Sequence, residues 1–322
     1  MQTSRRDVLR LIAASGAACL SAPLAQALSG DEPILDCHIH LFDPRRPGGI
    51  PWPLPGDAIY APALPDRYAA IATPFGVRGA IVVEASPRME DNDWVLQVAA
   101  ANPIIVGFIG DLIPGAVRYD QQLDRLRANP LFLGFRYGNL WSRSLSSDSR
   151  NPGFVDGLRR LADAGLVLES ANPDPELIAA LLGISARIPD LRIVVDHLPS
   201  LQMPVDSSAR RSYLDNLHRL AANQNVFVKL SEIPVRIDGS TRLDLPYYRD
   251  HLDEIWNVFG EDRVLFGSDW PNSDHLAIYG DTLKLVRSYM DAKTKVQRHK
   301  FFWSNSIRAY RWKPRNGEQE PV

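Results

Sequence analysis

The sequence has 322 residues, of which 45% are hydrophobic and 23% are charged, and its formal net charge is −2. This is ordinary globular composition, and the chain is long enough for one large domain with a full core or for two small ones. A near-neutral charge gives no attraction to phosphate, so nothing favours a nucleic-acid partner. The two cysteines, Cys19 and Cys37, are too few for a disulfide scaffold or a cysteine-based metal site.

Residues 1–27 predict a targeting signal rather than a folded segment. The paired arginines Arg5-Arg6 precede a modest apolar run at residues 11–24, and Ala25-Gln26-Ala27 is typical of a signal-peptide cleavage site. This pattern resembles a twin-arginine signal, which exports folded proteins in bacteria. We therefore expect a periplasmic or secreted protein. No later run is long and apolar enough to span a membrane, so we expect no membrane association after cleavage.

Short apolar runs alternate with longer helical patterns along the rest of the chain. Eight runs predict strands, at residues 34–40, 79–86, 104–112, 132–139, 166–171, 191–198, 226–232 and 264–269. The helical patterns fall at residues 92–101, 117–128, 154–164, 175–188, 209–222 and 247–259, and in a long segment from about residue 276. Eight strands alternating with helices is the count of an α/β fold with a single (β/α)₈ TIM barrel. A doubly wound open sheet is the alternative, but no glycine-rich phosphate loop follows the first strand.

The predicted barrel spans residues 28–313, with one long connection and one tail. The Pro/Gly-rich segment Pro44–Pro65 is longer than most connections and carries Trp52. We expect this segment to form a lid over the end of the first strand. Residues 314–322 predict a disordered tail, because chain ends fray unless they are tied down.

The first predicted strand ends in Asp36-Cys37-His38-Ile39-His40. Successive side chains of a strand point to opposite faces, so we expect Asp36, His38 and His40 to share one face. Cys37 would then point away from that face as a buried apolar residue. Two imidazoles on one side of a strand can hold one metal ion or one substrate, whereas a lone histidine would more simply cap the strand end.

Polar residues recur at the ends of the other predicted strands. A charged side chain inside an apolar strand is costly unless it is paired or solvated. In a TIM barrel the carboxyl ends of all strands meet at the face that carries the active site. The sequence therefore predicts one shared polar pocket. Its candidates, beside the first strand, are Glu84, Arg136, Glu169, Asp196, His197, Lys229, Ser231 and Asp269.

Several of these motifs together resemble the amidohydrolase superfamily, and in particular its lactonase-like branch. That branch includes 2-pyrone-4,6-dicarboxylate, sulfomuconolactone and sugar-acid lactonases. The resemblance covers almost all of the chain after residue 27 and implies a (β/α)₈ hydrolase. The sequence departs from the pattern at residues 166–171, where metal-dependent members usually place a histidine and this chain has none. The matching segments are Asp36–His40, Pro51-Trp52, Gly134–Arg136, Val194–Pro199, Val228–Ser231 and Phe266–Pro271.

The resemblance implies an enzyme that opens a small cyclic ester, a lactone of an acidic or sugar-acid compound. Asp269 would take a proton from the attacking water, since a carboxylate can act as a general base. The histidines would polarise the scissile carbonyl, and the basic residues would bind an acidic arm of the small-molecule substrate. The candidate catalytic residues are Asp269, His197, His38 and His40, and the candidate substrate-binding residues are Arg136, Lys229, Glu84 and Trp52.

The sequence leaves open whether the enzyme binds a metal ion. His38, His40 and Asp269 give three ligands, and three protein ligands plus water suit a catalytic zinc ion. Lactonases of this type also work without metal, so both possibilities stand. Two other functions stand beside hydrolysis: a metal-dependent decarboxylase of the same superfamily, and a non-catalytic barrel that captures an anion. The intact histidine–aspartate set favours the hydrolase, because binding alone does not need a base.

Overall fold

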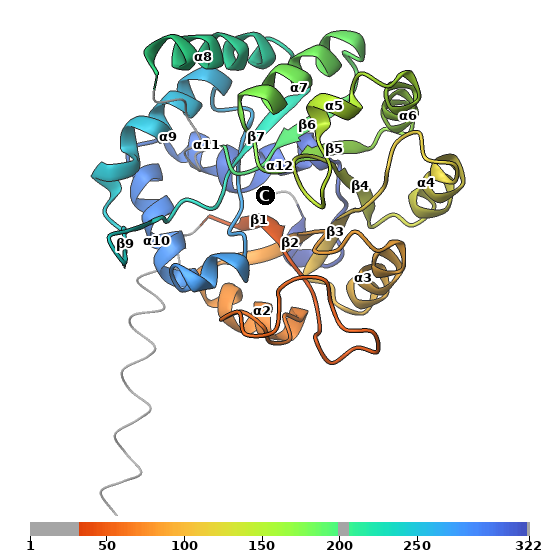
Figure 1. Ribbon diagram of the computed structural model, residues 1–322. Coiled ribbons are helices and arrows are strands. Elements are labelled where there is room, and N and C mark those ends of the chain that lie inside the picture. The colour runs from red at the N-terminus through yellow and green to blue at the C-terminus, as the bar shows by residue number, and fades with distance from the viewer. Residues whose placement is uncertain (1–31, 199–205, 321–322) are drawn as a thin grey trace, which may run out of the picture.

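The computed structural model describes residues 32–198 and 206–320, so the predicted export signal lies outside the described residues. Eight parallel strands pair in the order in which they follow one another in the chain, and helices surround them (Figure 1). The predicted TIM barrel is therefore confirmed. The strands are β1 (Ile34–Ile39), β2 (Val77–Val83), β3 (Ile105–Gly110), β4 (Phe132–Arg136), β5 (Val167–Ser170), β6 (Arg192–Val195), β7 (Val226–Leu230) and β10 (Val264–Phe266).

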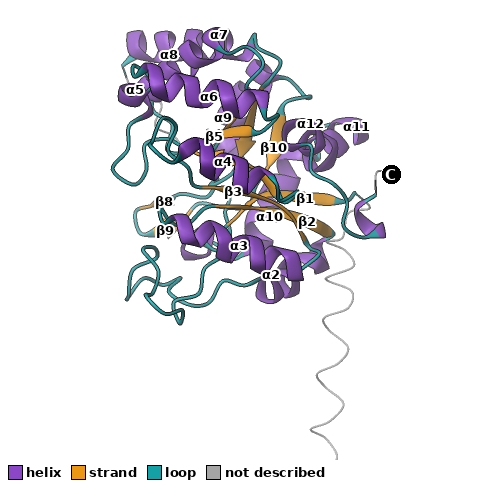
Figure 2. Cartoon of the chain, turned by 90° about the vertical axis from the view of Figure 1, so that its right-hand side faces the viewer, coloured by secondary structure: helices purple, strands orange, loops and turns teal. Residues whose placement is uncertain are grey.

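The helices pack on the outside of the strands, and Figure 2 shows them wrapped along the barrel. A short hairpin of β8 (Arg236–Ile237) and β9 (Ser240–Thr241) extends the connection after β7. None of the helices in the described parts has the length and apolar character needed to cross a bilayer. The helices are α2 (Pro65–Ala72), α3 (Met89–Ala101), α4 (Tyr119–Arg127), α5 (Leu145–Asp148), α6 (Pro152–Asp163), α7 (Pro175–Arg187), α8 (Ser207–Ala221), α9 (Leu245–Phe259), α10 (Tyr279–Met290), α11 (Lys295–His299) and α12 (Asn305–Tyr310).

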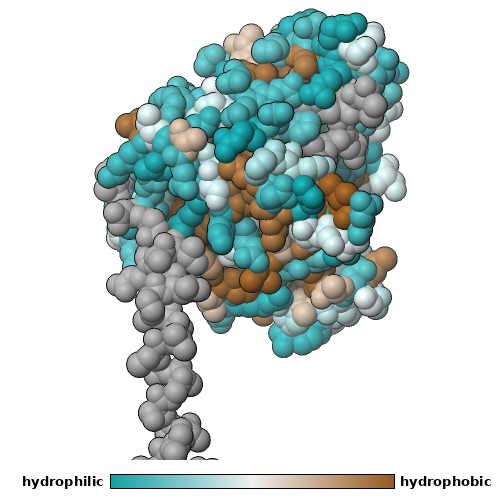
Figure 3. Space-filling view, turned by 90° about the vertical axis from the view of Figure 1, so that its left-hand side faces the viewer, coloured by the Kyte–Doolittle hydropathy of each residue, from teal (hydrophilic) through white to brown (hydrophobic). Residues whose placement is uncertain are grey.

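Two apolar clusters form the core. The larger lies between strands and helices, and the smaller fills the barrel interior, because each of the eight strands contributes to it. Trp303, Tyr310 and Trp312 of the C-terminal segment pack against the interior cluster. Figure 2 shows α11 and α12 at the end of the barrel opposite the β8–β9 hairpin. The outer surface over α8–α10 is mostly hydrophilic, with hydrophobic side chains in patches (Figure 3).

The barrel closes between its first and last strands. Ile39 and Trp270 form an isolated parallel bridge, in which the His40 amide donates to the Trp270 carbonyl at 2.7 Å. The Asp269 amide donates to the His38 carbonyl at 2.8 Å. These backbone bonds bring the two histidines of β1 next to Asp269, although more than 200 residues separate them in the sequence.

The expected alternation of side chains along β1 is wrong at Asp36 and Cys37. The pairing with β2 shifts register between Asp36 and Ile39, as at a β-bulge. The Asp36 carboxylate accepts hydrogen bonds from Tyr68 of α2 at 2.9 Å and Tyr279 of α10 at 3.2 Å, so it faces the outer helices. Cys37 is buried as expected, but inside the barrel. The register shift allows His38 to face the barrel axis together with Cys37.

The predicted disordered tail is also wrong for residues 314–320. The Arg315 guanidinium donates to four carbonyls at the end of α3 and the start of β3, at 2.6–3.0 Å. The Gln319 side chain is fully buried and donates to the Arg78 and Pro103 carbonyls, at 2.9 Å each. The last carbonyls of a helix have no partner within the helix, and a cationic side chain can satisfy them. The segment is therefore tied down, while residues 321–322 lie outside the described part.

Candidate active site

A cavity of about 200 Å³ opens among the loops that follow the strands. Five of the eight residues predicted to be catalytic or substrate-binding line this cavity. His38, a sixth, lies beneath them with no exposed surface. Lys229 and Glu84 are not among its walls. The lining residues are His40, Trp52, Ala85, Arg136, Leu140, Trp141, Ala171, Asn172, His197, Glu232, Asp269 and Asn272.

Asp269 is the centre of the polar groups at the cavity floor. Its Oδ1 atom lies 3.1 Å from Nε2 of His40 and 3.5 Å from Nε2 of His38, and its Oδ2 atom accepts a hydrogen bond from Asn272 at 2.7 Å. Burial would raise the pKa of Asp269, but His197, His40 and His38 together hold it well below its ordinary value. Asp269 is therefore an ionised carboxylate at neutral pH.

The hydrogen bonds of His40 fix which of its nitrogens carries the proton. Nδ1 lies 2.9 Å from the Val83 carbonyl, which can only accept, so Nδ1 is the donor. In the neutral ring, Nε2 then presents a lone pair to the Asp269 carboxylate at 3.1 Å. Two acceptors this close need a cation or a proton between them. A histidine that donates its other N–H to a backbone carbonyl is also the usual arrangement of a metal ligand.

The residues at this point fit a divalent ion. His38, His40 and Asp269 form one of the groups whose ligand atoms converge, and Nε2 of His38 is buried without a hydrogen-bond partner. Burial and the Lys229 charge lower the pKa of His38 well below its ordinary value, so its ring is neutral as a ligand must be. Tetrahedral zinc ligands at about 2.0–2.1 Å lie about 3.3 Å apart. The two observed separations from Asp269, 3.1 and 3.5 Å, bracket that value.

His197 is held beside this centre by a serine. Its Nδ1 atom lies 2.9 Å from the Ser231 hydroxyl, which also accepts the His197 backbone amide at 3.3 Å. The rings of His197 and His38 are 4.6 Å apart. Ser231 follows β7, so two neighbouring strands fix the direction in which the His197 ring faces the cavity.

Strained backbone is concentrated around the cavity. In the described chain, eight non-glycine residues have a φ in the left-handed region, and five of them line the cavity. Such conformations cost free energy and persist where the surrounding structure holds them, commonly at functional sites. The five residues are Trp141, Asn172, His197, Glu232 and Asp269.

Glu84 holds two walls of the cavity in place. Its carboxylate accepts from Nε of Arg136 at 2.8 Å and from Nε1 of Trp141 at 3.0 Å, and its carbonyl accepts from Nη2 of Arg136 at 2.8 Å. Every one of these groups is buried or half-buried. The carboxylate is therefore occupied by protein groups, and Glu84 orients Arg136 and Trp141 rather than reaching the cavity itself.

Lys229 does not reach the cavity either. Its ammonium is fully buried, 2.8 Å from Glu169 and 3.1 Å from Asp196, with Nδ1 of His38 at 3.3 Å. Burial alone would lower the pKa of Lys229, but the two carboxylates hold it above its ordinary value. The expected contact with an anionic substrate is not available to a lysine in this position. Lys229 instead contacts Nδ1 of His38 on the side of the ring away from the cavity.

The connection after β1 covers the end of that strand, where a lid was expected. Phe42 and Ala63 pair at its base, and its residue Trp52 lies edge-on to His40 with ring centres 5.5 Å apart. Trp52 thereby forms part of the cavity wall. An aromatic ring at this place excludes water from one side of the histidine–aspartate centre.

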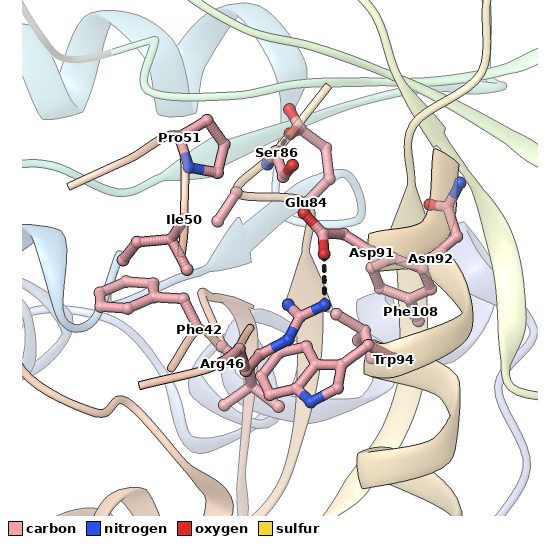
Figure 4. Close-up of a pocket in the computed structure, with 13 residues that line it drawn as sticks. Phe42, Arg46, Ile50, Pro51, Glu84, Ser86, Asp91, Asn92, Trp94 and Phe108 are labelled. Atoms are coloured by element: carbon pink, nitrogen blue, oxygen red, sulfur yellow. Dashed lines mark hydrogen bonds and ion pairs between the residues drawn. The ribbon is translucent and has the colours of Figure 1, made fainter. Parts of the chain in front are cut away.

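A small cavity under this connection shows how it is anchored (Figure 4). Its volume of about 20 Å³ has room for about one water, so it is no substrate site. Arg46 pairs with Asp91 of α3 at 2.6 Å and lies over the Trp94 ring at 4.3 Å. Arg88 donates to the carbonyls of Gly48 and Gly49 at 3.2 Å each. These contacts fix the connection that carries Trp52.

Four polar or aromatic residues of the cavity were not among the candidates from the sequence. Glu232 lies with one carboxylate oxygen 3.9 Å from Nδ1 of His197, and burial raises its pKa. Glu232 and Asn172 each lie two residues after the end of a strand, β7 and β5, which is the signal that could have found them. Trp141 and Asn272 lie further into connections, where only the three-dimensional structure shows which side chains turn inward.

The sequence and the fold were compared with those of known proteins. Residues 35–312 match the amidohydrolase family. An L-fucono-1,5-lactonase from Burkholderia ambifaria is 26% identical over 88% of this chain and 98% of its own length. Among solved structures, an amidohydrolase from Burkholderia multivorans with bound zinc has a TM-score of 0.75 at 21% identity, over 87% of this chain and all of that one. A probable 2-pyrone-4,6-dicarboxylic acid hydrolase from Acinetobacter baumannii with citric acid bound has a TM-score of 0.68 at 17% identity, over 86% and 98%.

Proposed function

The chain belongs to the amidohydrolase family, and on this premise we propose that it opens the lactone ring of a polyhydroxylated sugar acid. The observation that carries the proposal is the convergence of Asp269, His40 and His197 on one cavity whose other walls include two tryptophans. The curated relative named an L-fucono-1,5-lactonase supports the substrate class over nearly its full length.

The reaction needs an activated water and stabilisation of the oxyanion that develops on the lactone carbonyl. Asp269 accepts the proton of the attacking water. Because its pKa is held low, Asp269 alone is a weak base, which favours a site that also acidifies the water. A divalent ion held by His38, His40 and Asp269 would supply that, since a metal-bound water has a pKa near 7. His197 lies where it can donate to the carbonyl oxygen.

The protein groups that line the cavity favour a lactone without extra carboxylates. Of the described lining residues, Arg136 is the one permanent cation, and its Nε and Nη2 atoms already donate to Glu84. Little of its guanidinium is therefore left to bind the carboxylated arm of a substrate. Trp52 and Trp141 suit the C–H faces of a sugar ring, and Asn172 and Asn272 suit its hydroxyl groups.

The test is acid release measured by pH-stat on a panel of 1,4- and 1,5-lactones of hexonic and 6-deoxyhexonic acids, with dicarboxylated lactones in the same panel. We expect turnover of neutral sugar lactones with a kcat/KM at least tenfold above that for the dicarboxylated ones. Turnover of the dicarboxylated lactones alone would overturn the substrate class. Release of CO₂ from aromatic acids, with no lactone turnover, would establish the decarboxylase instead.

A further inference from the structure

A second cavity, of about 300 Å³, adjoins the catalytic cavity on the side of the connection after β7. Asn172 and Glu232 line both cavities, so the two spaces adjoin and share these walls. The catalytic cavity, at about 200 Å³, is smaller than the roughly 300–1,000 Å³ typical of ligand sites. Together with its neighbour it falls within that range. The remaining walls are Pro173, Pro234, Val235, Arg236 and Leu276.

The residues between the two cavities are held in defined positions. Asn172 has a φ of 53° and Glu232 a φ of 52°, both in the left-handed region that a glutamate rarely adopts. The Asn172 side chain donates to the Asn139 carbonyl at 3.0 Å. Glu232 faces His197, so its carboxylate stands between the reacting centre and the second cavity. Backbone strain at the two residues that the cavities share is typical of a functional site.

The chemistry of the second cavity suits a neutral, hydroxylated group. Pro173, Pro234 and Leu276 give apolar walls, while Glu232 supplies a carboxyl group and Arg236 a guanidinium group. The Arg236 guanidinium donates to the His275 carbonyl at 2.8 Å, which holds it at the rim. Carboxylate and guanidinium groups bind hydroxyls, and apolar walls pack against C–H faces.

We propose that the second cavity is a subsite for a sugar unit attached to the lactone ring, so that the enzyme hydrolyses disaccharide aldonolactones. This inference rests on the proposed lactonase function. It also implies that the substrate is supplied by a reaction that oxidises the reducing end of a disaccharide, because that oxidation converts the end ring to a lactone and leaves the second sugar in place.

The experiment compares glucono-1,5-lactone with cellobiono-1,5-lactone, which have the same lactone ring and differ by one glucosyl unit. We expect the disaccharide lactone to have a kcat/KM at least tenfold higher. Val235→Phe should fill the second cavity, since Val235 is half-buried in its wall and its backbone is pinned by bonds to Tyr248 and Arg242. That variant should lower kcat/KM about tenfold for the disaccharide lactone and less than twofold for the other.

Ile278→Phe is the matched control, because Ile278 is 67% exposed and lines neither cavity. Equal kcat/KM values for the two lactones, or an equal effect of Val235→Phe on both, would overturn the subsite while leaving the lactonase intact. If neither lactone is turned over, the full lactone panel decides the proposed function, and calorimetry with the corresponding non-hydrolysable lactams decides the subsite separately. Tighter binding of the disaccharide lactam, lost in Val235→Phe, supports it; equal binding or none overturns it.

Discussion

At the scale of single residues, the Asp269 carboxylate has two proposed roles. It faces Nε2 of both His38 and His40, as a metal ligand would, and it lines the cavity proposed to hold the attacking water. Its low pKa makes it a weak base toward free water but an adequate one toward a water acidified by an ion. Because a change at Asp269 would affect both roles, the metal ligand set is tested separately at His40.

Asp269→Asn keeps the shape of the side chain and its contact with Asn272 but removes the base. We expect kcat on the best lactone to fall by about 10²–10⁴-fold, the usual range for loss of general-base catalysis. Steady-state kinetics on purified protein is the measurement, with circular dichroism to show that the variant is folded. A variant with the kcat of the unmodified enzyme would exclude Asp269 as the base.

His40→Ala should remove the bound ion. Its Nε2 atom supplies one of three converging ligands, and a site with two protein ligands binds zinc much more weakly. Elemental analysis after gel filtration should find about one divalent ion in the unmodified enzyme and little in the variant. His218→Ala is the control, since His218 is exposed on α8. An unmodified enzyme that is fully active without metal would leave a metal-free mechanism and contradict the assignment.

At the scale of elements, an ion pair anchors the connection that carries Trp141. Asp111, just after β3, pairs with Arg143 at 2.8 Å, and both side chains are largely buried. Burial raises the pKa of Asp111 to about 6, although Arg143 opposes this. The folded state therefore holds a proton on Asp111 more tightly than the unfolded state does. Stability from this group is greatest below pH 4 and declines as pH rises from about 4 to about 6.

Asp111→Asn should remove that decline. Relative to this variant, the unmodified protein should lose about 3 kcal/mol of unfolding free energy between pH 4 and pH 6.5, the order of magnitude of such a shift. Urea unfolding at a series of pH values measures it. Asp93→Asn is the control, because Asp93 pairs with Arg125 at the surface with half of its side chain exposed. Parallel stability curves for Asp111→Asn and the unmodified protein would show that Asp111 titrates normally.

The element scale also shows what the sequence can predict. Apolar runs ending in polar residues were enough to place eight strands and to bring His40, His197 and Asp269 together, because parallel strands must end at one face. Simple alternation failed at Asp36 because the register shift in β1 is a property of its pairing with β2. The sequence could not show that Lys229 is buried, because its partner Glu169 lies on a different strand. It also could not show that Trp141 turns toward the cavity, because its partner Glu84 follows another strand.

At the scale of the whole molecule, the C-terminal segment is part of the fold. The position at the chain end predicted a frayed tail, but Arg315 donates four hydrogen bonds to carbonyls at the end of α3 and the start of β3. Trp312 and Tyr310 also complete the interior cluster. Residues from β1 to Trp312 therefore take part in enclosing the barrel, and we expect the barrel to fold only after Trp312 has been synthesised.

A barrel that folds only after most of the chain has been synthesised is compatible with the predicted export signal, because twin-arginine signals export proteins that have already folded. We expect that replacing both Arg5 and Arg6 by lysine leaves the precursor in the cytoplasm, while the unmodified chain yields a shortened protein in the periplasm. Cell fractionation followed by mass spectrometry of the N-terminus measures both. A barrel-disrupting variant, such as deletion from Trp312 onward, should also stay in the cytoplasm despite an intact signal. Normal export of the lysine variant would show that another route is used.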